Sequence, residues 1–230
     1  MTTSAAPAQK TAQPVGLKPL VKGLFHRLLS LGSGETGVHV NRYRMYVDIT
    51  EAMKPYAARP HPGQPVILGV GRSLPLATRL CVPNARIIDG DMPEYDLLNL
   101  HNVPDNSLDY IASDQVLEHV KGNPQRAADE SLRVLKPGGI AVHTTCLLTE
   151  LHGGVEPNGH LRDYWRFTPN GLAMLFQQFS HVQTGAWGNR LAFMLLRFLP
   201  TPDAPWHPIH RVAMYNEPEF PIVTWIIAQK

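Results

Sequence analysis

Residues 66–73 read VILGVGRS. A run of apolar residues ends here in two glycines, Gly69 and Gly71, that a single residue separates. Such a run predicts a buried strand, and glycines at its end allow a tight turn in which a ligand can approach backbone N–H groups. No third glycine follows, and no carboxylate lies just ahead. Taken alone, the stretch is compatible with a nucleotide site or with an ordinary turn.

Strand and helix patterns alternate on the carboxyl side of this stretch. Further strands are predicted at 85–91, 108–114, 140–148, 181–187 and 220–229, and helices at 38–58, 123–139, 168–179 and 190–199. This alternation predicts an α/β fold: a doubly wound, mostly parallel sheet with helices on both faces. A long helical stretch separates the last two strands and permits an antiparallel final strand.

The amino-terminal residues divide into two parts. Residues 1–16 lack the apolar core of a signal peptide and are expected to form a disordered tail. Residues 17–31 place four leucines on one helical face beside basic residues, which indicates either a helix packed on the domain or one that contacts a membrane surface or a partner. We therefore divide the chain into a tail, a helical lead-in at 17–62 and a main domain at 63–230.

The amino-acid composition limits the classes of function that the chain can have. Hydrophobic residues make up 43% and charged residues 17% of the 230 residues, which is typical of a globular domain. A net charge of +2 gives no indication of nucleic-acid binding. Two cysteines form neither a disulfide framework nor a metal motif, and no apolar run has transmembrane length, so a cytoplasmic protein is expected. The histidines show no ligand spacing that predicts a metal site.

Polar residues follow each predicted strand. In a parallel sheet these positions share one edge, near which ligands bind. They are Gly69, Gly71, Arg72 and Ser73 after the first strand; Asp89 and Asp91 at the second; Asp96 beyond it; and Ser113, Asp114, Gln115, Glu118 and His119 after the next. A carboxylate at Asp89 or Asp91 can accept hydrogen bonds from both ribose hydroxyls, and Asp96 can accept one from an adenine amine. The glycine pair itself fits an NAD-type oxidoreductase almost as well as a methyltransferase.

Residues 103–139 distinguish these alternatives. PDNSLD at 104–109, VLEHV at 116–120 and SLRVLKPGG at 131–139 occur in one order and spacing. In these motifs the chain resembles class I S-adenosylmethionine-dependent methyltransferases. The resemblance implies a Rossmann-like fold with a seven-stranded sheet, S-adenosylmethionine as cofactor, and methyl transfer to an acceptor. An oxidoreductase would leave these motifs unexplained, whereas a non-catalytic module with the same fold stays open as an alternative.

A narrower resemblance covers DYWRFTP at 163–169. This segment is similar to one in a methyltransferase subgroup linked to glycan pathways, which implies a small-molecule or glycan-type acceptor. The chain departs from the family in two places. Leu68 occupies the region where the family usually places an acid before the glycine loop, and the third glycine is replaced.

Together these observations give a set of candidate site residues. The cofactor-binding candidates are Gly69, Gly71, Arg72, Ser73, Asp89, Asp91, Asp96, Leu97, Asp114 and Gln115. The catalytic candidates are His119, Asp114 and His152, among which His119 is the first choice for a base because imidazole titrates near neutral pH. The acceptor-binding candidates are His160, Tyr164 and Arg166, although an internal ion pair is the favoured alternative for Arg166.

Overall fold

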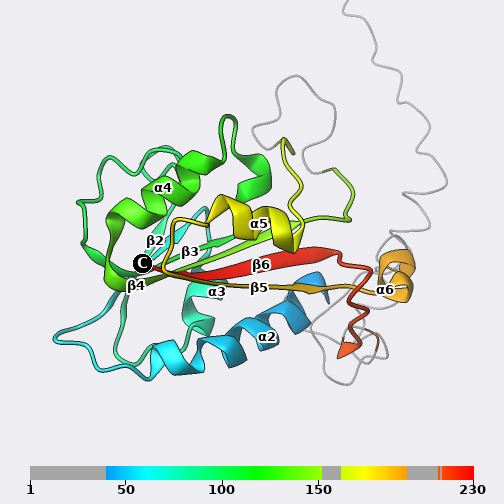
Figure 1. Ribbon diagram of the computed structural model, residues 1–230, viewed down its shortest axis with the longest axis horizontal. Coiled ribbons are helices and arrows are strands. Elements are labelled where there is room, and N and C mark those ends of the chain that lie inside the picture. Colours follow the sequence, from blue (N-terminus) through cyan, green and yellow to red (C-terminus); the bar gives the residue numbers. More distant parts are fainter. Residues whose placement is uncertain (1–39, 152–161, 196–211, 213) are drawn as a thin grey trace, which may run out of the picture.

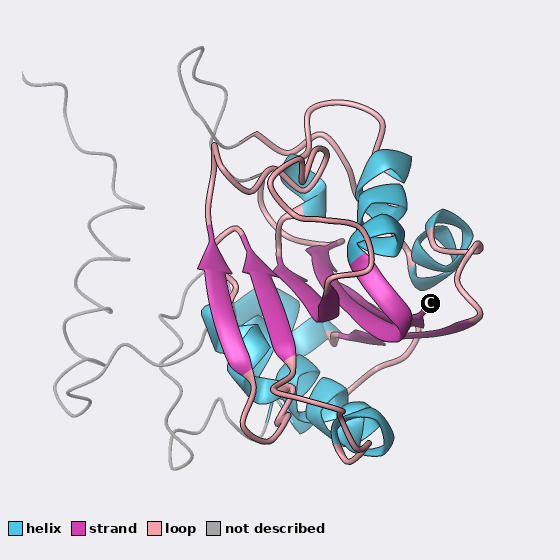
Figure 2. Cartoon of the chain, turned by 90° about the vertical axis from the view of Figure 1, so that its left-hand side faces the viewer, coloured by secondary structure: helices cyan, strands magenta, loops and turns pink. Residues whose placement is uncertain are grey.

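The computed structural model describes residues 40–151, 162–195, 212 and 214–230. In this part of the chain a six-stranded sheet forms the centre of the protein, with strands in the order β2-β1-β3-β4-β6-β5. Helices cover both of its sides (Figure 1), and the strands form one twisted layer (Figure 2). The predicted α/β class is therefore confirmed, and the described residues contain six of the seven strands that the resemblance implies.

Most strands of the sheet are parallel. The strands are β1 (Val66–Val70), β2 (Arg86–Gly90), β3 (Leu108–Asp114), β4 (Leu135–Cys146), β5 (His181–Trp187) and β6 (Val223–Gln229). β2, β1, β3 and β4 pair in parallel, whereas β6 runs antiparallel between β4 and β5. The chain leaves β1 toward β2 on one side and reaches β3 on the other. The carboxyl ends of β1 and β3 therefore flank the point where ligands bind in such sheets.

One face of the sheet carries three helices, α2 (Val40–Ala57), α3 (Leu74–Arg79) and α6 (Arg190–Leu195). α2 presents Met45, Ile49 and Met53, four residues apart, to the sheet, and all three are fully buried. They share a core with Ile67 of β1 and Trp225 of β6. Each such side chain stabilises the fold by about 1.5–3 kcal/mol, so α2 is anchored firmly beside the strand ends.

The opposite face carries α4 (Gln125–Val134) and α5 (Pro169–Leu175), above a second core that includes Leu68, Ile111 and Leu172. α5 begins as its sequence predicts, because Thr168 accepts a hydrogen bond from the N–H of Gly171 at 3.1 Å. α4 is shorter than the predicted helix at 123–139, since β4 already begins at Leu135.

The predicted lead-in at 17–62 is described only from residue 40 onward. That part includes α2, which packs in the same core as the sheet; the division at residue 62 remains a prediction. The expected basic helix at 17–31 lies outside the described residues. Within the described ranges, no helix combines the length and the apolar character needed to cross a bilayer.

Candidate active site

The loop after β1 depends on the backbone freedom of Gly71. Its φ is +71°, in the left-handed region that favours glycine, and its N–H donates to the carbonyl oxygen of Gly90 at 2.8 Å. This bond ties the loop to the end of β2. A Cβ added at Gly71 would lie 2.7 Å from Cγ2 of Val116, just beyond β3. The space that a side chain at position 71 would need is therefore already occupied by Val116.

Ser73 lies two residues after the glycine pair. Its side chain is fully buried, and its hydroxyl donates to the carbonyl oxygen of Val70 at 2.5 Å. The hydroxyl oxygen of Ser73 in turn accepts a hydrogen bond from the N–H of Asp114 at 2.7 Å. Ser73 therefore holds the glycine loop against the end of β3.

Two carboxylates mark the end of β2. Asp89 lies within the strand, opposite Gly69, and is exposed. Asp91 follows the last strand residue, and its Oδ2 accepts a hydrogen bond from Nε of Arg72 in the glycine loop at 2.9 Å. This hydrogen bond holds the pKa of Asp91 below its usual value. Of the two acids, Asp91 is thus the one that the structure joins to the loop.

The next two cofactor candidates lie in a turn after β2. Asp96 accepts the N–H of Leu98 through Oδ1 at 2.8 Å, and Leu97 is buried in the second core. Asp96 therefore stabilises its own turn. Its role toward an adenine stays a prediction.

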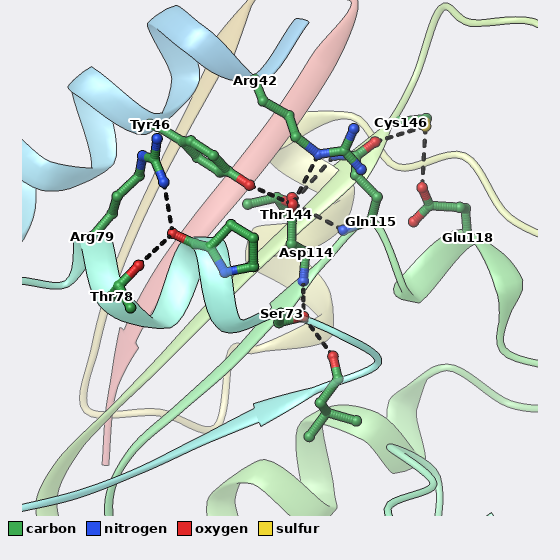
Figure 3. Close-up of polar contacts among 12 residues, drawn as sticks. Arg42, Tyr46, Ser73, Thr78, Arg79, Asp114, Gln115, Glu118, Thr144 and Cys146 are labelled. Atoms are coloured by element: carbon green, nitrogen blue, oxygen red, sulfur yellow. Dashed lines mark hydrogen bonds and ion pairs between the residues drawn. The ribbon is translucent and has the colours of Figure 1, made fainter. Parts of the chain in front are cut away.

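Asp114 ends β3 at the centre of a polar cluster (Figure 3). Its Oδ2 accepts hydrogen bonds from Arg42 at 2.8 Å and from the Tyr46 hydroxyl at 2.5 Å, while Oδ1 accepts one from Thr144 at 2.7 Å. Burial and the charge of Asp114 raise the pKa of Tyr46, so this phenol remains a donor. These three fixed donors make Asp114 a poor candidate for a mobile catalytic acid or base.

Gln115 extends the cluster toward Glu118. Gln115 has a φ of +58°, and its side chain joins Thr144 at 3.2 Å to the Cys146 sulfur at 2.7 Å. The carboxylate of Glu118 is fully buried and accepts hydrogen bonds from Thr145 at 3.0 Å and from Cys146 at 3.1 Å. Burial, together with the charge of Glu118, raises the pKa of Cys146 and keeps it a thiol.

His119 closes the turn η1 (Leu117–His119), and its Nδ1 faces two acceptors. The Arg162 carbonyl oxygen lies at 3.2 Å and Oδ1 of Asp163 at 3.0 Å. Because both are acceptors, we assign the ring proton to Nδ1, which makes Nε2 the proton acceptor of the neutral ring. Asp163 is nearly fully buried and also pairs with Arg166.

The remaining acceptor candidates separate. Arg166 forms the internal ion pair with Asp163 that its sequence context allowed. Tyr164 is 45% exposed and fixed through its backbone N–H, which donates to the Glu118 carbonyl at 2.7 Å. His152 and His160 lie outside the described residues. No group of three or more metal-ligating side chains occurs in the ranges that the structure describes.

The structure thus brings the loop after β1, the acids of β2 and the polar ends of β3 and β4 to one edge of the sheet. Sequence reasoning did not identify Arg42 and Tyr46 as site residues, because they come from a helix about 70 residues ahead of Asp114. The only signal in the sequence was the polar run NRYR at residues 41–44, ahead of the first strand.

Comparisons with known proteins agree with this architecture. A family model described as a methyltransferase domain matches residues 29–143, half of the chain. No curated protein matches the sequence. Among solved structures, the CurJ carbon methyltransferase is 13% identical, with a TM-score of 0.52, and the match covers 87% of this chain and 56% of that one.

A second solved structure of similar fold is phosphoethanolamine N-methyltransferase 2 of Haemonchus contortus, in complex with phosphomonomethylethanolamine and S-adenosylhomocysteine. It is 12% identical, with a TM-score of 0.51, and the match covers 94% of this chain and 58% of that one. At such identities the likeness concerns the fold alone. The family match, in contrast, spans the glycine loop and the end of β3, and excludes the oxidoreductase alternative. The chain therefore belongs to the methyltransferase-domain family and is a class I enzyme that uses S-adenosylmethionine.

Proposed function

We propose that this enzyme transfers a methyl group to a hydroxyl of a small-molecule or glycan-type acceptor, with His119 as the general base. The observation that carries the proposal is the contact of Nδ1 of His119 with Asp163 and with the Arg162 carbonyl. These contacts orient the ring, and a neutral imidazole with its proton on Nδ1 accepts a proton at Nε2. A hydroxyl, unlike an amine, must lose its proton during transfer, so it needs such a base.

The residues at the strand ends fit S-adenosylmethionine. Gly71 allows the tight turn that brings the loop to the ends of β2 and β3, and Asp91 beside the loop offers the acceptors that a ribose diol requires. When bound, the cofactor supplies a methyl group already activated on a sulfonium. The chain then has to orient the acceptor, exclude water and remove one proton.

Asp163 acts as a positioning residue for His119. Its carboxylate is buried, so its negative charge stabilises the imidazolium that forms when Nε2 takes the proton. Arg166 fixes the carboxylate from the other side. Replacement of Asp163 should therefore lower the rate of proton removal and leave the affinity for the cofactor unchanged.

Exposed aromatic side chains support a carbohydrate-like acceptor. Tyr164 and Trp165 are 45% and 37% exposed and precede Arg166 on the same segment. Trp165 donates through Nε1 to the Val120 carbonyl at 3.0 Å and stacks on Phe167, so its ring is rigid. Such rings offer flat apolar faces with a polar edge. The resemblance of this segment to a glycan-linked subgroup points to the same acceptor class.

The test is an assay of the full chain with methyl-labelled S-adenosylmethionine against free sugars, nucleotide sugars and phenols. We expect methylation of a hydroxyl, seen by mass spectrometry, and a loss of about 10²–10⁴-fold in rate for His119→Ala. His119→Ala should keep its affinity for S-adenosylhomocysteine. Asp163→Asn should lose less activity and show an altered pH–rate profile. His181→Ala, on the exposed end of β5, serves as the control.

Three results would contradict the proposal. One is exclusive methylation of nitrogen or carbon by the chain. Another is full activity in His119→Ala. The third is the absence of transfer to every hydroxylated acceptor while the cofactor binds.

A further inference from the structure

Arg42 carries hydrogen-bond donors that have no acceptor among the residues that the structure describes. Its Nε donates to Asp114 at 2.8 Å, and its side chain is 29% exposed. Neither terminal guanidinium nitrogen has a hydrogen-bond partner in the part of the chain that the structure describes. A guanidinium presents five N–H donors in a flat fork that suits a carboxylate. Figure 3 shows Arg42 held by Asp114 at the end of β3, and its two terminal nitrogens can take a further acceptor there.

Arg133 shows what a purely structural arginine looks like in this protein. Its side chain donates to the carboxylates of Glu130 and Asp105 and to the carbonyl oxygens of Leu100 and Val103. All three of its nitrogens are engaged. The contrast indicates that Arg42 is arranged to bind something besides Asp114.

The position of the Arg42 fork is fixed relative to the glycine loop. Asp114 holds Nε of Arg42 through its side chain and contacts Ser73 of the loop through its backbone N–H at 2.7 Å. Burial lowers the pKa of Arg42, but the charge and hydrogen bond of Asp114, together with Tyr46 and Cys146, raise it above its ordinary value, so the guanidinium stays charged. Asp114 thus links a permanently charged guanidinium to the glycine loop.

The strand order indicates that the amino-acid end of the cofactor lies near Arg42, at the carboxyl end of β3. With the ribose at the end of β2, S-adenosylmethionine has to cross β1 to reach β3, because β1 lies between these strands. Its far end is an amino acid with a free carboxylate. The chain has the buried Leu68 where an acid would usually help to position this end.

We propose that Arg42 binds the carboxylate at the amino-acid end of S-adenosylmethionine, with Asp114 as the residue that positions its guanidinium. This inference rests on the proposed placement of the cofactor along the strand ends. It concerns cofactor recognition and is independent of the acceptor and of the base. A bidentate pair between a guanidinium and a carboxylate is among the stronger hydrogen-bonded contacts in proteins.

The test compares cofactors that differ in this one group, by calorimetric titration of the full chain. S-Adenosylmethionine and S-adenosylhomocysteine carry the carboxylate; decarboxylated S-adenosylmethionine and methylthioadenosine do not. We expect Arg42→Gln to bind S-adenosylmethionine and S-adenosylhomocysteine about 10- to 100-fold more weakly than the wild type does. The affinities of the other two should change by less than about twofold. Arg44→Gln, two residues along α2 and paired with Asp48, is the matched control and should change none of them.

Wild-type protein alone provides a second measurement, which stands even if Arg42→Gln fails to fold. It should bind decarboxylated S-adenosylmethionine about 10- to 100-fold more weakly than S-adenosylmethionine. Equal affinities in the wild type, or an Arg42→Gln variant that weakens all four molecules equally or none of them, would overturn the role of Arg42 and leave the methyltransferase function intact. A wild-type chain that binds none of the four would contradict the proposed function as well.

Discussion

The hydroxyl of Ser73 lies between the Val70 carbonyl and the N–H of Asp114, at 2.5 Å and 2.7 Å. One buried side chain thereby closes the glycine loop and joins it to the neighbouring strand. A glycine at this position could make neither bond. Ser73 is therefore a structural tie, and it keeps Asp114 and its partners next to the loop.

Loss of this tie should loosen the site. Ser73→Ala removes the buried hydroxyl that bonds the Val70 carbonyl and the partly buried N–H of Asp114, which should cost about 1–3 kcal/mol of folding stability. Affinity for S-adenosylhomocysteine should fall with it. Chemical denaturation and calorimetry measure the two effects. Thr78→Ala, which removes an exposed hydroxyl on α3, should cost less than about 0.5 kcal/mol; equal losses in the two variants would refute the tie.

Gly71 should be intolerant of any side chain for two separable reasons. Alanine at this φ of +71° is strained by about 1–2 kcal/mol, and its Cβ would overlap Val116. Val116→Ala in the same chain should relieve the overlap but not the strain, so the double variant should recover only part of the stability. Gly63→Ala, where a Cβ meets nothing within 4 Å, is the control. Thermal unfolding of the wild type, Gly71→Ala, Gly71→Ala with Val116→Ala, and Gly63→Ala separates the effect of backbone strain from that of the overlap.

Asp91 should contribute more to cofactor affinity than Asp89. Asp91 follows the end of β2 and contacts the glycine loop, whereas Asp89 lies within the strand. We expect Asp91→Asn to weaken S-adenosylhomocysteine binding by at least tenfold, measured by calorimetry, and Asp89→Asn to weaken it less. Arg72→Ala removes only an exposed partner of Asp91 and should have the smaller effect. The opposite ranking of the two acids would move the ribose contact to Asp89.

His143 should make the protein less stable in mild acid. Burial lowers the pKa of His143 to about 3 from an ordinary 6.5, and the ring lies between the hydroxyls of Ser113 and Ser131. Between these two values the unfolded chain binds a proton that the folded chain does not. The free energy of unfolding should therefore decrease as the pH falls below 6.5, by up to about 1.4 kcal/mol per pH unit.

Denaturation of His143→Gln from pH 7 to pH 5 checks this term. The variant should lose less stability over this range than the wild type, whatever its stability at neutral pH. His181→Gln, on the exposed end of β5, should keep the wild-type slope. An unchanged slope in His143→Gln would show that other groups cause the acid sensitivity.

The two cysteines should differ in reactivity. Cys81 is exposed, whereas Cys146 is buried and burial raises its pKa. The thiolate is the reactive form, so a thiol reagent at pH 8 should modify only Cys81 in the folded protein. Both should react in denaturant. Rapid modification of Cys146 in the native state would contradict the closed network around Glu118.

Local sequence patterns predicted the parts of this structure that local interactions decide. Thr168 followed by Pro169 marks the start of α5, and apolar runs locate the strands. The carboxyl ends of the strands follow from the parallel topology, which is why Ser73 and Asp114 were found together. Arg42 and Tyr46 could not be paired with Asp114 from sequence, since their contacts depend on how α2 crosses the sheet. The start of β4 at Leu135 was likewise missed, because the preceding helix pattern runs into it.

A crystal structure of the chain with S-adenosylhomocysteine tests the central claim most directly, because it locates each end of the cofactor. We predict the ribose hydroxyls within hydrogen-bond distance of the Asp91 carboxylate, the cofactor crossing the loop at Gly71, and its carboxylate on the guanidinium of Arg42. A nucleoside bound away from the carboxyl ends of β2, β1 and β3 would contradict the account.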